Sequence, residues 1–348
     1  MNQPKINFGS ENFAGVQPEI MNALAAANVG QVPSYGNDAY SHATVELFKQ
    51  EFGENIDVYF TFNGTGANNF GIGAVVERYQ SIFCTDVSHL FVDESTAPET
   101  FIGCRIYPVN SANGKISVTD LRARIKRVND IHHPQARIVT LTQPTEYGTV
   151  YSIEELRQIK AVCTEHAMLL HVDGARFFNA AASLGGTLKE ITADAGVDIL
   201  TLGGTKIGMM FGEAVIFFNP VKPPTYKFNL KRSMQLASKN RFIAVQFQAV
   251  LLDELWRRIA THANQLALSF SKAVTSFPEI ELAYPVDTNA VFLKMPKAVA
   301  LELQEFATFY LWNEARNEYR FMFSFDSTQE EAELFCERLR EVLSSQAV

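Results

Sequence analysis

Cysteine is scarce in this sequence, and its spacing excludes two common ways of stabilising a fold. The 348 residues include four cysteines, and no two of them stand in a C-x-x-C spacing. They are Cys84, Cys104, Cys163 and Cys336. This usage is typical of reduced, buried thiols, so we expect neither a disulfide framework nor a zinc or other metal site.

Positive charge and long apolar runs are scarce as well. The sequence has 30 Lys and Arg against 38 Asp and Glu, a net charge of −8. A nucleic-acid surface needs clustered positive charge to neutralise phosphates, so we expect no nucleic-acid partner. No uncharged run approaches the ~20 apolar residues that span a bilayer, and the first residues lack the basic and apolar regions of a signal peptide. We therefore expect a cytoplasmic protein without a membrane partner.

From about residue 56 onward, short apolar runs alternate regularly with helical segments. The expected strands are IDVYFTF, SIFC, CRIYPV, ARIVTLT, AMLLHVD, DILTLGG and EAVIFF. One intervening segment, YSIEELRQIKAVCTEH, opens with a capping box from Ser152 to Glu155 and continues with helical spacing of its apolar residues. This alternation predicts an α/β domain whose largely parallel sheet is covered on both faces.

The pattern changes near residue 220, where NPVKPP interrupts it. A long helical stretch follows, and three further strand-like runs lie beyond it. They are EIELAYPV, NAVFLKM and YRFMFSF. We predict an N-terminal segment and a large domain over residues 1–254, and a smaller α/β domain over residues 255–348. The length of the chain fits two domains.

Three features stand at the ends of predicted strands, where parallel sheets bind their ligands. The first is the glycine-rich turn TFNGTGANNFGIG, residues 61–73. A strand, a glycine-rich turn and a helix together offer free N–H groups and a helix N-terminus to a phosphate. The turn is not a dinucleotide fingerprint, because Asn69 takes the place of the third glycine, and no G-K-[ST] follows. A turn that serves packing alone remains an alternative.

The other two features are an aspartate and a lysine. Asp173, in LLHVDGARFFN, directly follows an apolar strand, and Arg176 lies just beyond it. Lys206, in DILTLGGTKIGMMFGEAVIFF, has glycines and apolar residues around it, with no charge nearer than Asp198 and Glu213. Taken singly, the aspartate could cap a turn, the arginine could form a surface ion pair, and the lysine could extend to solvent.

Together the three features are the parts of a pyridoxal phosphate (PLP) site. A desolvated lysine amine is a nucleophile that can hold the PLP aldehyde as a Schiff base. A carboxylate keeps the pyridine nitrogen protonated, so that the ring accepts electrons. An arginine is then available for a substrate carboxylate. We interpret Lys206 as the Schiff-base lysine.

From about Phe8 to about Asp326 the sequence resembles the threonine aldolases, a family of fold-type I PLP enzymes. The similar blocks are SENFAGVQPEIMNAL, YGND, FNGTGAN, DVSHLFVDE, DIHHPQARIVTLTQPTEYGTVY, HVDGARFFNAAASLG and GGTKIGMMFGEAV. The strongest is HVDGARFFNA, followed at a distance by the lysine of GGTK. The resemblance implies a large domain with a seven-stranded, mainly parallel sheet and a smaller C-terminal α/β domain.

The resemblance also implies roles for individual residues. Cofactor contacts are implied for Gly64, Thr65, Gly66, His89, Asp173, Arg176 and Lys206. Substrate contacts are implied for Ser10, Arg176 and Arg320. The three residues of the Gly-Thr-Gly run would hold the phosphate, and His89 would stack on the ring as a catalytic group. His132 is similar to a histidine near the substrate β-hydroxyl, although a loop-capping role is the alternative. Tyr35 would either reach a neighbouring subunit's pocket or pack at an interface.

The implied activity is cleavage of L-threonine, L-allo-threonine and related L-β-hydroxy-α-amino acids to glycine and an aldehyde. The implied assembly is a homo-oligomer, a dimer or tetramer, with active sites at its interfaces. Another PLP reaction on the same scaffold, β-elimination or transamination, stays open, as does a PLP-binding protein without turnover. The sequence departs from the common family pattern before the lysine, where Gly-Gly-Thr replaces Ser-Leu-Ser, and Glu11 replaces an aspartate. The base could be a histidine, a water or a phosphate-linked water.

Overall fold

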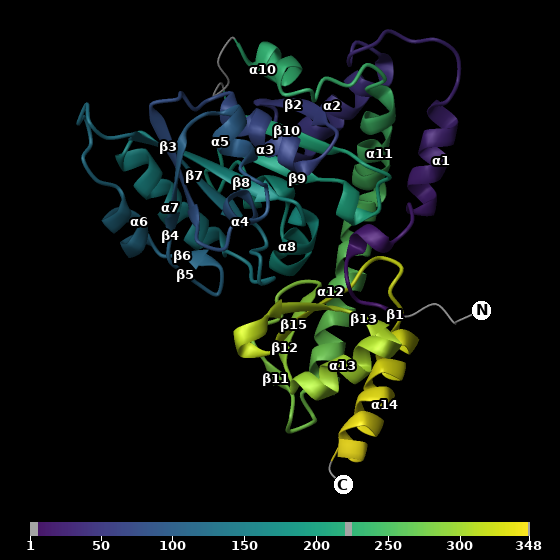
Figure 1. Ribbon diagram of the computed structural model, residues 1–348. Coiled ribbons are helices and arrows are strands. Elements are labelled where there is room, and N and C mark those ends of the chain that lie inside the picture. Colours follow the sequence, from purple (N-terminus) through teal and green to yellow (C-terminus); the bar gives the residue numbers. More distant parts are fainter. Residues whose placement is uncertain (1–5, 220–224, 347–348) are drawn as a thin grey trace.

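The computed structural model describes residues 6–219 and 225–346, which form a large domain above a smaller one (Figure 1). A seven-stranded sheet in the order β2-β10-β9-β8-β7-β3-β4 lies at the centre of the large domain. Its strands are β2 (Ile56–Thr61), β3 (Gln80–Thr85), β4 (Arg105–Val109), β7 (Gln135–Thr142), β8 (Leu169–Gly174), β9 (Ile199–Gly203) and β10 (Glu213–Phe218). The predicted fold class, a seven-stranded mainly parallel sheet with helices, is confirmed.

One strand of the sheet, β10, runs antiparallel to both of its neighbours. It follows β9 after only the short connection 204–212, whereas a parallel pair needs a crossover of about a dozen residues or more. Lys206 lies in this connection, on the 3-10 turn η2 (Thr205–Ile207). The tight reversal therefore keeps the lysine at the edge of the sheet where β9 ends.

Helices cover both faces of the large sheet. Successive residues of a strand point to opposite faces, and so Ile138 packs in one apolar cluster while Val139 packs in the other. The helices and 3-10 turns of this part are η1 (Glu11–Phe13), α1 (Pro18–Ala27), α2 (Ala39–Phe52), α3 (Gly64–Gly73), α4 (His89–Val92), α5 (Ala97–Phe101), α6 (Val118–Arg124), α7 (Ile153–Glu165), α8 (Phe177–Leu184), α9 (Leu188–Ile191), α10 (Tyr226–Arg232), α11 (Arg241–Leu251) and η3 (Leu252–Glu254). The capping box predicted from Ser152 to Glu155 opens α7. A small hairpin, β5 (Ser111–Ala112) and β6 (Lys115–Ile116), completes this part.

The C-terminal part has a four-stranded antiparallel sheet in the order β11-β12-β15-β14. Its elements are α12 (Leu255–Val274), β11 (Glu281–Leu282), β12 (Ala290–Lys294), α13 (Lys297–Phe306), β13 (Ala307–Thr308), β14 (Tyr310–Asn313), η4 (Glu314–Arg316), β15 (Glu318–Met322) and α14 (Gln329–Gln346). Its core is a cluster of phenylalanines that includes Phe8, which stacks on Phe270 with ring centroids 5.6 Å apart.

Two segments connect the domains. The first turns of α12 belong to the large core, where Trp256 lies 5.5 Å from Phe178 between ring centroids, and its later residues belong to the small core. Strand β1 (Ile6–Asn7) pairs in parallel with β13 of the C-terminal part. The predicted domain boundary at residue 254 stays a prediction. The start of α12 follows this boundary but packs in the large core, and β1 precedes it but pairs with a strand of the C-terminal part.

The described residues show other features that bear on the site. No helix among them is long and apolar enough to cross a membrane, and no cluster of three or more His, Cys, Asp and Glu side chains among them could hold a metal ion. The four cysteines are unpaired; Cys84, Cys104 and Cys163 are buried, and Cys336 is half-buried.

Candidate active site

A cavity of about 500 Å³ lies beyond the carboxyl ends of the parallel strands. Thr142, Asp173 and Thr201 reach it from β7, β8 and β9. Trp312 and Arg320 reach it from the small domain. The cavity is therefore closed by both domains, at the place where parallel sheets bind ligands.

Lys206 lies half-buried on the η2 turn and lines this cavity. A Cβ built on Gly203 would lie 2.4 Å from the backbone oxygen of Ala175, and one on Gly204 would lie 2.4 Å from the sulfur of Met209. These glycines are needed because neighbouring chain packs against them. The pKa of Lys206 is lowered by Arg176 first and by burial second, against the opposing effect of nearby carboxylates. A lowered pKa increases the fraction of the lysine that is a neutral, nucleophilic amine at a given pH.

Asp173 is held in a fixed orientation at the end of β8. Its Oδ2 accepts a hydrogen bond of 2.8 Å from the side-chain amide of Asn68, and its Oδ1 accepts one of 3.1 Å from the N–H of Ala175. The side chain is buried and lines the same cavity as Lys206. A carboxylate fixed in this way suits the protonated nitrogen of a bound pyridine ring.

The glycine-rich turn forms the N-terminus of α3. Asn63 caps the helix, because its Oδ1 accepts from the N–H of Gly66 at 2.8 Å. Gly64 and Thr65 line the cavity, and a Cβ built on Gly64 would meet no atom within 4 Å. Gly66 instead packs against the side chain of Gln235, where a Cβ would come within 2.2 Å. The turn thus offers open space at a helix N-terminus, as a phosphate requires.

His89 is the first residue of α4 and lines the cavity. Its backbone N–H donates to Oε1 of Glu146 at 2.8 Å, and its Nδ1 lies 3.1 Å from Oε1 of Glu94. The hydrogen bond with Glu94 raises the pKa of His89, against burial, which lowers it.

The two arginines expected at the substrate carboxylate have different partners. Arg176 forms a bidentate pair with Glu11, with Nε–Oε1 and Nη2–Oε2 distances of 2.5 and 2.9 Å. Burial alone would raise the pKa of Glu11, but Arg176 and Lys206 together hold it near about 2. Asn289 also donates to Glu11, at 2.8 Å. Arg176 thus pairs with Glu11 and also lines the cavity, so its contact with substrate or cofactor stays a prediction.

Arg320 keeps donors available. Its Nη2 donates to the carbonyl of Gly9 at 3.3 Å, whereas its buried Nε has no hydrogen-bond partner among the described residues. Its guanidinium lies 4.9 Å from the ring centroid of Trp312, a cation–π contact. Burial lowers its pKa to about 10, which leaves it charged at neutral pH. Ser10, at the N-cap of η1, also lines the cavity.

Three predicted residues do not line the cavity of their own chain: Gly66, which packs against Gln235, and the more distant His132 and Tyr35. His132 is exposed in the loop before β7, where its N–H donates to Asp130. The eight residues of β7 separate it from Thr142 by roughly 26 Å at a rise of about 3.3 Å per residue. Tyr35 is half-exposed in a loop with a φ of 59°, and its N–H donates to Ser238.

Several functional candidates were missed in the sequence. Asn68, Glu94, Thr142, Glu146 and Glu213 all line the cavity. Glu213 holds the lysine turn, because its carboxylate accepts from the N–H of Gly204 at 2.8 Å and the hydroxyl of Thr205 at 2.9 Å. Burial raises its pKa to about 7. The sequence showed Glu213 near Lys206, but it did not show that β10 runs antiparallel to β9 and so places Glu213 beside the lysine turn.

Glu146 is a second buried acid. It accepts from the N–H of His89 and from the hydroxyl of Thr142, the latter at 2.6 Å, and its Oε2 has no hydrogen-bond partner among the described residues. Burial raises its pKa to about 7, although both hydrogen bonds favour the charged form.

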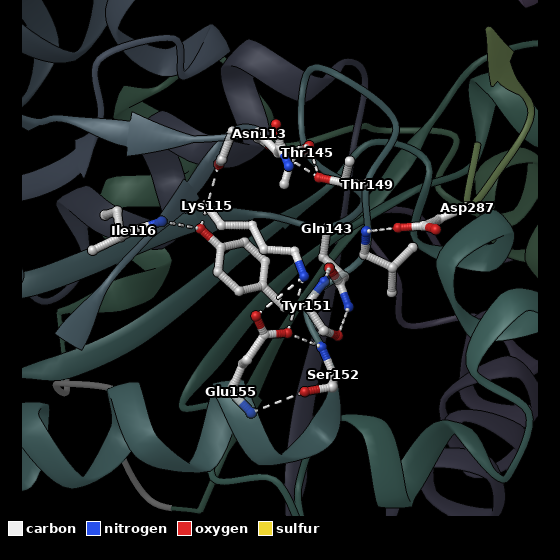
Figure 2. A network of polar contacts seen from close by, with 12 residues as sticks. Asn113, Lys115, Ile116, Gln143, Thr145, Thr149, Tyr151, Ser152, Glu155 and Asp287 are labelled. Atoms are coloured by element: carbon white, nitrogen blue, oxygen red, sulfur yellow. Dashed lines mark hydrogen bonds and ion pairs between the residues drawn. The ribbon is translucent and has the colours of Figure 1, made fainter. Parts of the chain in front are cut away.

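The loop that carries Glu146 is held by a polar network (Figure 2). The side chain of Gln143 bonds both the N–H and the carbonyl of Tyr151, at 2.9 and 2.8 Å. The hydroxyls of Thr145 and Thr149 lie 2.7 Å apart, and Asp287 accepts from a backbone N–H of this loop at 3.0 Å. Because Asp287 comes from the C-terminal part, the network also ties the loop to the small domain.

The side chains that line the cavity match the chemical groups of PLP. It combines a half-buried amine, a fixed carboxylate, an open helix N-terminus and a histidine, which are the groups that bind the aldehyde, the ring nitrogen, the phosphate and the ring face. The unpartnered Nε of Arg320 adds a donor for a carboxylate.

The fold and this donor set define a fold-type I PLP enzyme. The chain belongs to the beta-eliminating lyase family, whose model matches residues 7–296. It is 38% identical to the low specificity L-threonine aldolase of Pseudomonas sp. (strain NCIMB 10558), over 97% of this chain and 98% of that protein. It is 39% identical to that of Pseudomonas aeruginosa, with the same coverage of both chains. The structure of Leishmania major threonine aldolase matches with a TM-score of 0.92 at 26% identity, over 97% of this chain and 99% of that one. These findings confirm the resemblance inferred from the sequence and the expected cofactor.

Proposed function

We propose that this protein is a PLP-dependent aldolase that cleaves L-threonine, L-allo-threonine and related L-β-hydroxy-α-amino acids to glycine and an aldehyde. The observation that carries the proposal is the meeting of Lys206, Asp173 and Arg320 in one cavity. Its chain is similar to two low specificity L-threonine aldolases over nearly its whole length. PLP, when bound, supplies an electron sink for the carbon left when the Cα–Cβ bond breaks.

The residues of the cavity have distinct tasks in this proposal. Lys206 would hold the aldehyde of the cofactor through its amine. Asp173 would face the ring nitrogen and favour its protonated form, and Arg320, which lines the cavity, would bind the substrate carboxylate. Arg176 fixes Glu11 at the cavity wall. Because both domains line the cavity, side chains from both would shield the bond that breaks from bulk water.

The finer features of the assembly also belong to this proposal. His132 and Tyr35 lie outside the cavity of their own chain, so any contact they make with a substrate requires a second copy. We propose a cytoplasmic homo-oligomer, a dimer or tetramer, in which exposed loops meet a neighbouring cavity.

The direct test is acetaldehyde release from L-threonine by PLP-loaded protein, coupled to reduction of the aldehyde. We expect release that depends on PLP, that falls to background in Lys206→Ala, and that is unchanged in Lys189→Ala. Lys189 is a matched control, because it is an exposed lysine paired with Asp194 on the surface. Formation of a keto acid and ammonia would instead show that the protein is a β-eliminating enzyme. No turnover of L-threonine, L-allo-threonine or bulkier β-hydroxy amino acids would refute the proposed function.

A further inference from the structure

Four polar side chains form a continuous chain along the cavity. The Nδ1 atom of His89 lies 3.1 Å from Oε1 of Glu94. The amide of Asn68 donates to the same oxygen of Glu94 at 3.0 Å and to Oδ2 of Asp173 at 2.8 Å. His89 and Asp173 are thus joined through two residues, Asn68 and Glu94.

The carboxyl group of Glu94 has few other partners. The residue is 4% exposed, and its Oε2 has no hydrogen-bond partner among the described residues. A buried carboxylate is costly unless a donor or an opposite charge compensates it. The donors that it has are the amide of Asn68 and the ring of His89. Glu94 is therefore placed to interact with the protonated ring of His89.

The same contacts fix the tautomer of His89. A carboxylate only accepts hydrogen bonds, so the proton of the neutral imidazole must sit on Nδ1. Asn68 must likewise turn its NH₂ group toward the two carboxylates. The Nε2 atom of His89 is left with its lone pair, on a ring that lines the cavity.

We propose that Glu94 is the positioning residue of a His89–Glu94 pair that accepts the substrate's β-hydroxyl proton. This inference rests on the proposed aldolase function. Nε2 of His89 takes the proton, the O–H electron pair becomes the second bond of the aldehyde C=O, and the Cα–Cβ bond breaks. The electron pair of that bond stays with the carbon that becomes Cα of glycine, and the balance closes when that carbon regains a proton. Glu94 then faces an imidazolium and stabilises its charge.

The charged groups around His89 come from several elements. Its hydrogen bond with Glu94 is the largest effect and raises the pKa of the ring; Asp173 on β8 raises it further, while burial and Lys206 on η2 lower it. Glu146 bonds the backbone of His89 rather than its ring. Asp93, next to Glu94, lines the same cavity. Removing the charge of Glu94 alone should therefore lower the pKa of His89.

The test compares Glu94→Gln with wild type by NMR of ¹³C-labelled histidine rings in the full-length, cofactor-free protein. His89→Asn identifies the His89 signal by its loss. We expect the titration midpoint of His89 to move to lower pH in Glu94→Gln, and to move less in Glu94→Asp, which keeps the charge but shortens the side chain. Glu46→Gln, which removes an exposed carboxylate on α2, is the matched control and should leave the midpoint unchanged.

The second readout is the pH dependence of kcat/KM, measured with the PLP-loaded enzyme. We expect Glu94→Gln to lower kcat/KM about tenfold or more at neutral pH and to move the limb of the pH profile set by His89 to lower pH. In a His89→Asn background, Glu94→Gln should cause no further loss. An unchanged His89 midpoint, or a loss of activity without movement of the limb, would overturn the proposal. Absence of aldehyde release by wild type would refute the proposed function instead, and the NMR titration would still report on the pair.

Discussion

Two cavities of about 500 Å³ each lie at opposite ends of the central sheet, and their chemistry differs. The one at the carboxyl ends contains buried atoms of Glu94, Glu146 and Arg320 without hydrogen-bond partners among the described residues. The one at the amino ends of β3 and β7 is lined by arginines as well. There Arg137 donates to the carbonyls of Val75 and Ala167, at 3.0 and 3.4 Å.

The difference shows that volume does not distinguish the two sites. At the amino ends, polar side chains satisfy carbonyls where helices and loops end, a structural task. At the carboxyl ends, charged groups are buried and left incompletely paired, which costs stability unless a ligand or a proton compensates. The unsatisfied charge at the carboxyl ends therefore marks the functional site.

The larger change in folding stability should come from substitution of the buried acid Glu146. Its pKa is raised from an ordinary 4.5 to about 7, so the folded state holds a proton that the unfolded state loses between these values. Stability therefore falls as pH rises from about 4.5 to about 7, and the full cost remains above that window. We expect Glu146→Gln, which keeps an acceptor for His89 and Thr142, to stabilise the cofactor-free protein by about 3 kcal/mol at pH 8 and by about 1 kcal/mol at pH 5.

Urea unfolding of both proteins at the two pH values measures this difference. Glu213 also has a raised pKa, but it is present in both proteins and cancels. Equal stabilisation at pH 5 and pH 8 would contradict a charge effect and point to altered packing.

The smaller change in folding stability should come from substitution of Arg137, at the other end of the sheet. Arg137→Gln removes two donors to backbone carbonyls, and we expect a loss of stability of about 1 kcal/mol. We expect kcat and KM for L-threonine to stay within about twofold of wild type, because the residue lies at the amino end of β7. A large loss of activity with little loss of stability would break the distinction between the two cavities.

Most of the frame of the site could be predicted from the sequence. Lys206, Asp173 and Gly64 follow strands, and the carboxyl ends of parallel strands must meet at one edge. The sequence also indicates that His132 lies away from the cavity of its own chain, since a residue that precedes a parallel strand lies at the opposite edge, and its role stays a prediction. Its predicted role was taken from the resemblance, and one chain does not bring it to the cavity.

The polar partners within the site could not be predicted in the same way. Asn68 on α3 and Glu94 in the turn after α4 meet at the end of the sheet, and no local spacing encodes that contact. Glu146 lies in a loop whose shape depends on a network that includes Asp287. Arg176 was expected to contact substrate or cofactor, but its partner in the structure is Glu11, far away in the sequence.

The central claim is that Lys206 is the residue that holds PLP. Its most direct test is borohydride reduction of the PLP-loaded protein, followed by digestion and mass mapping of the modified peptide. The account predicts one pyridoxyl group on Lys206 and loss of the visible absorption in Lys206→Ala. Stoichiometric labelling of a different lysine, or unchanged absorption in Lys206→Ala, would contradict it.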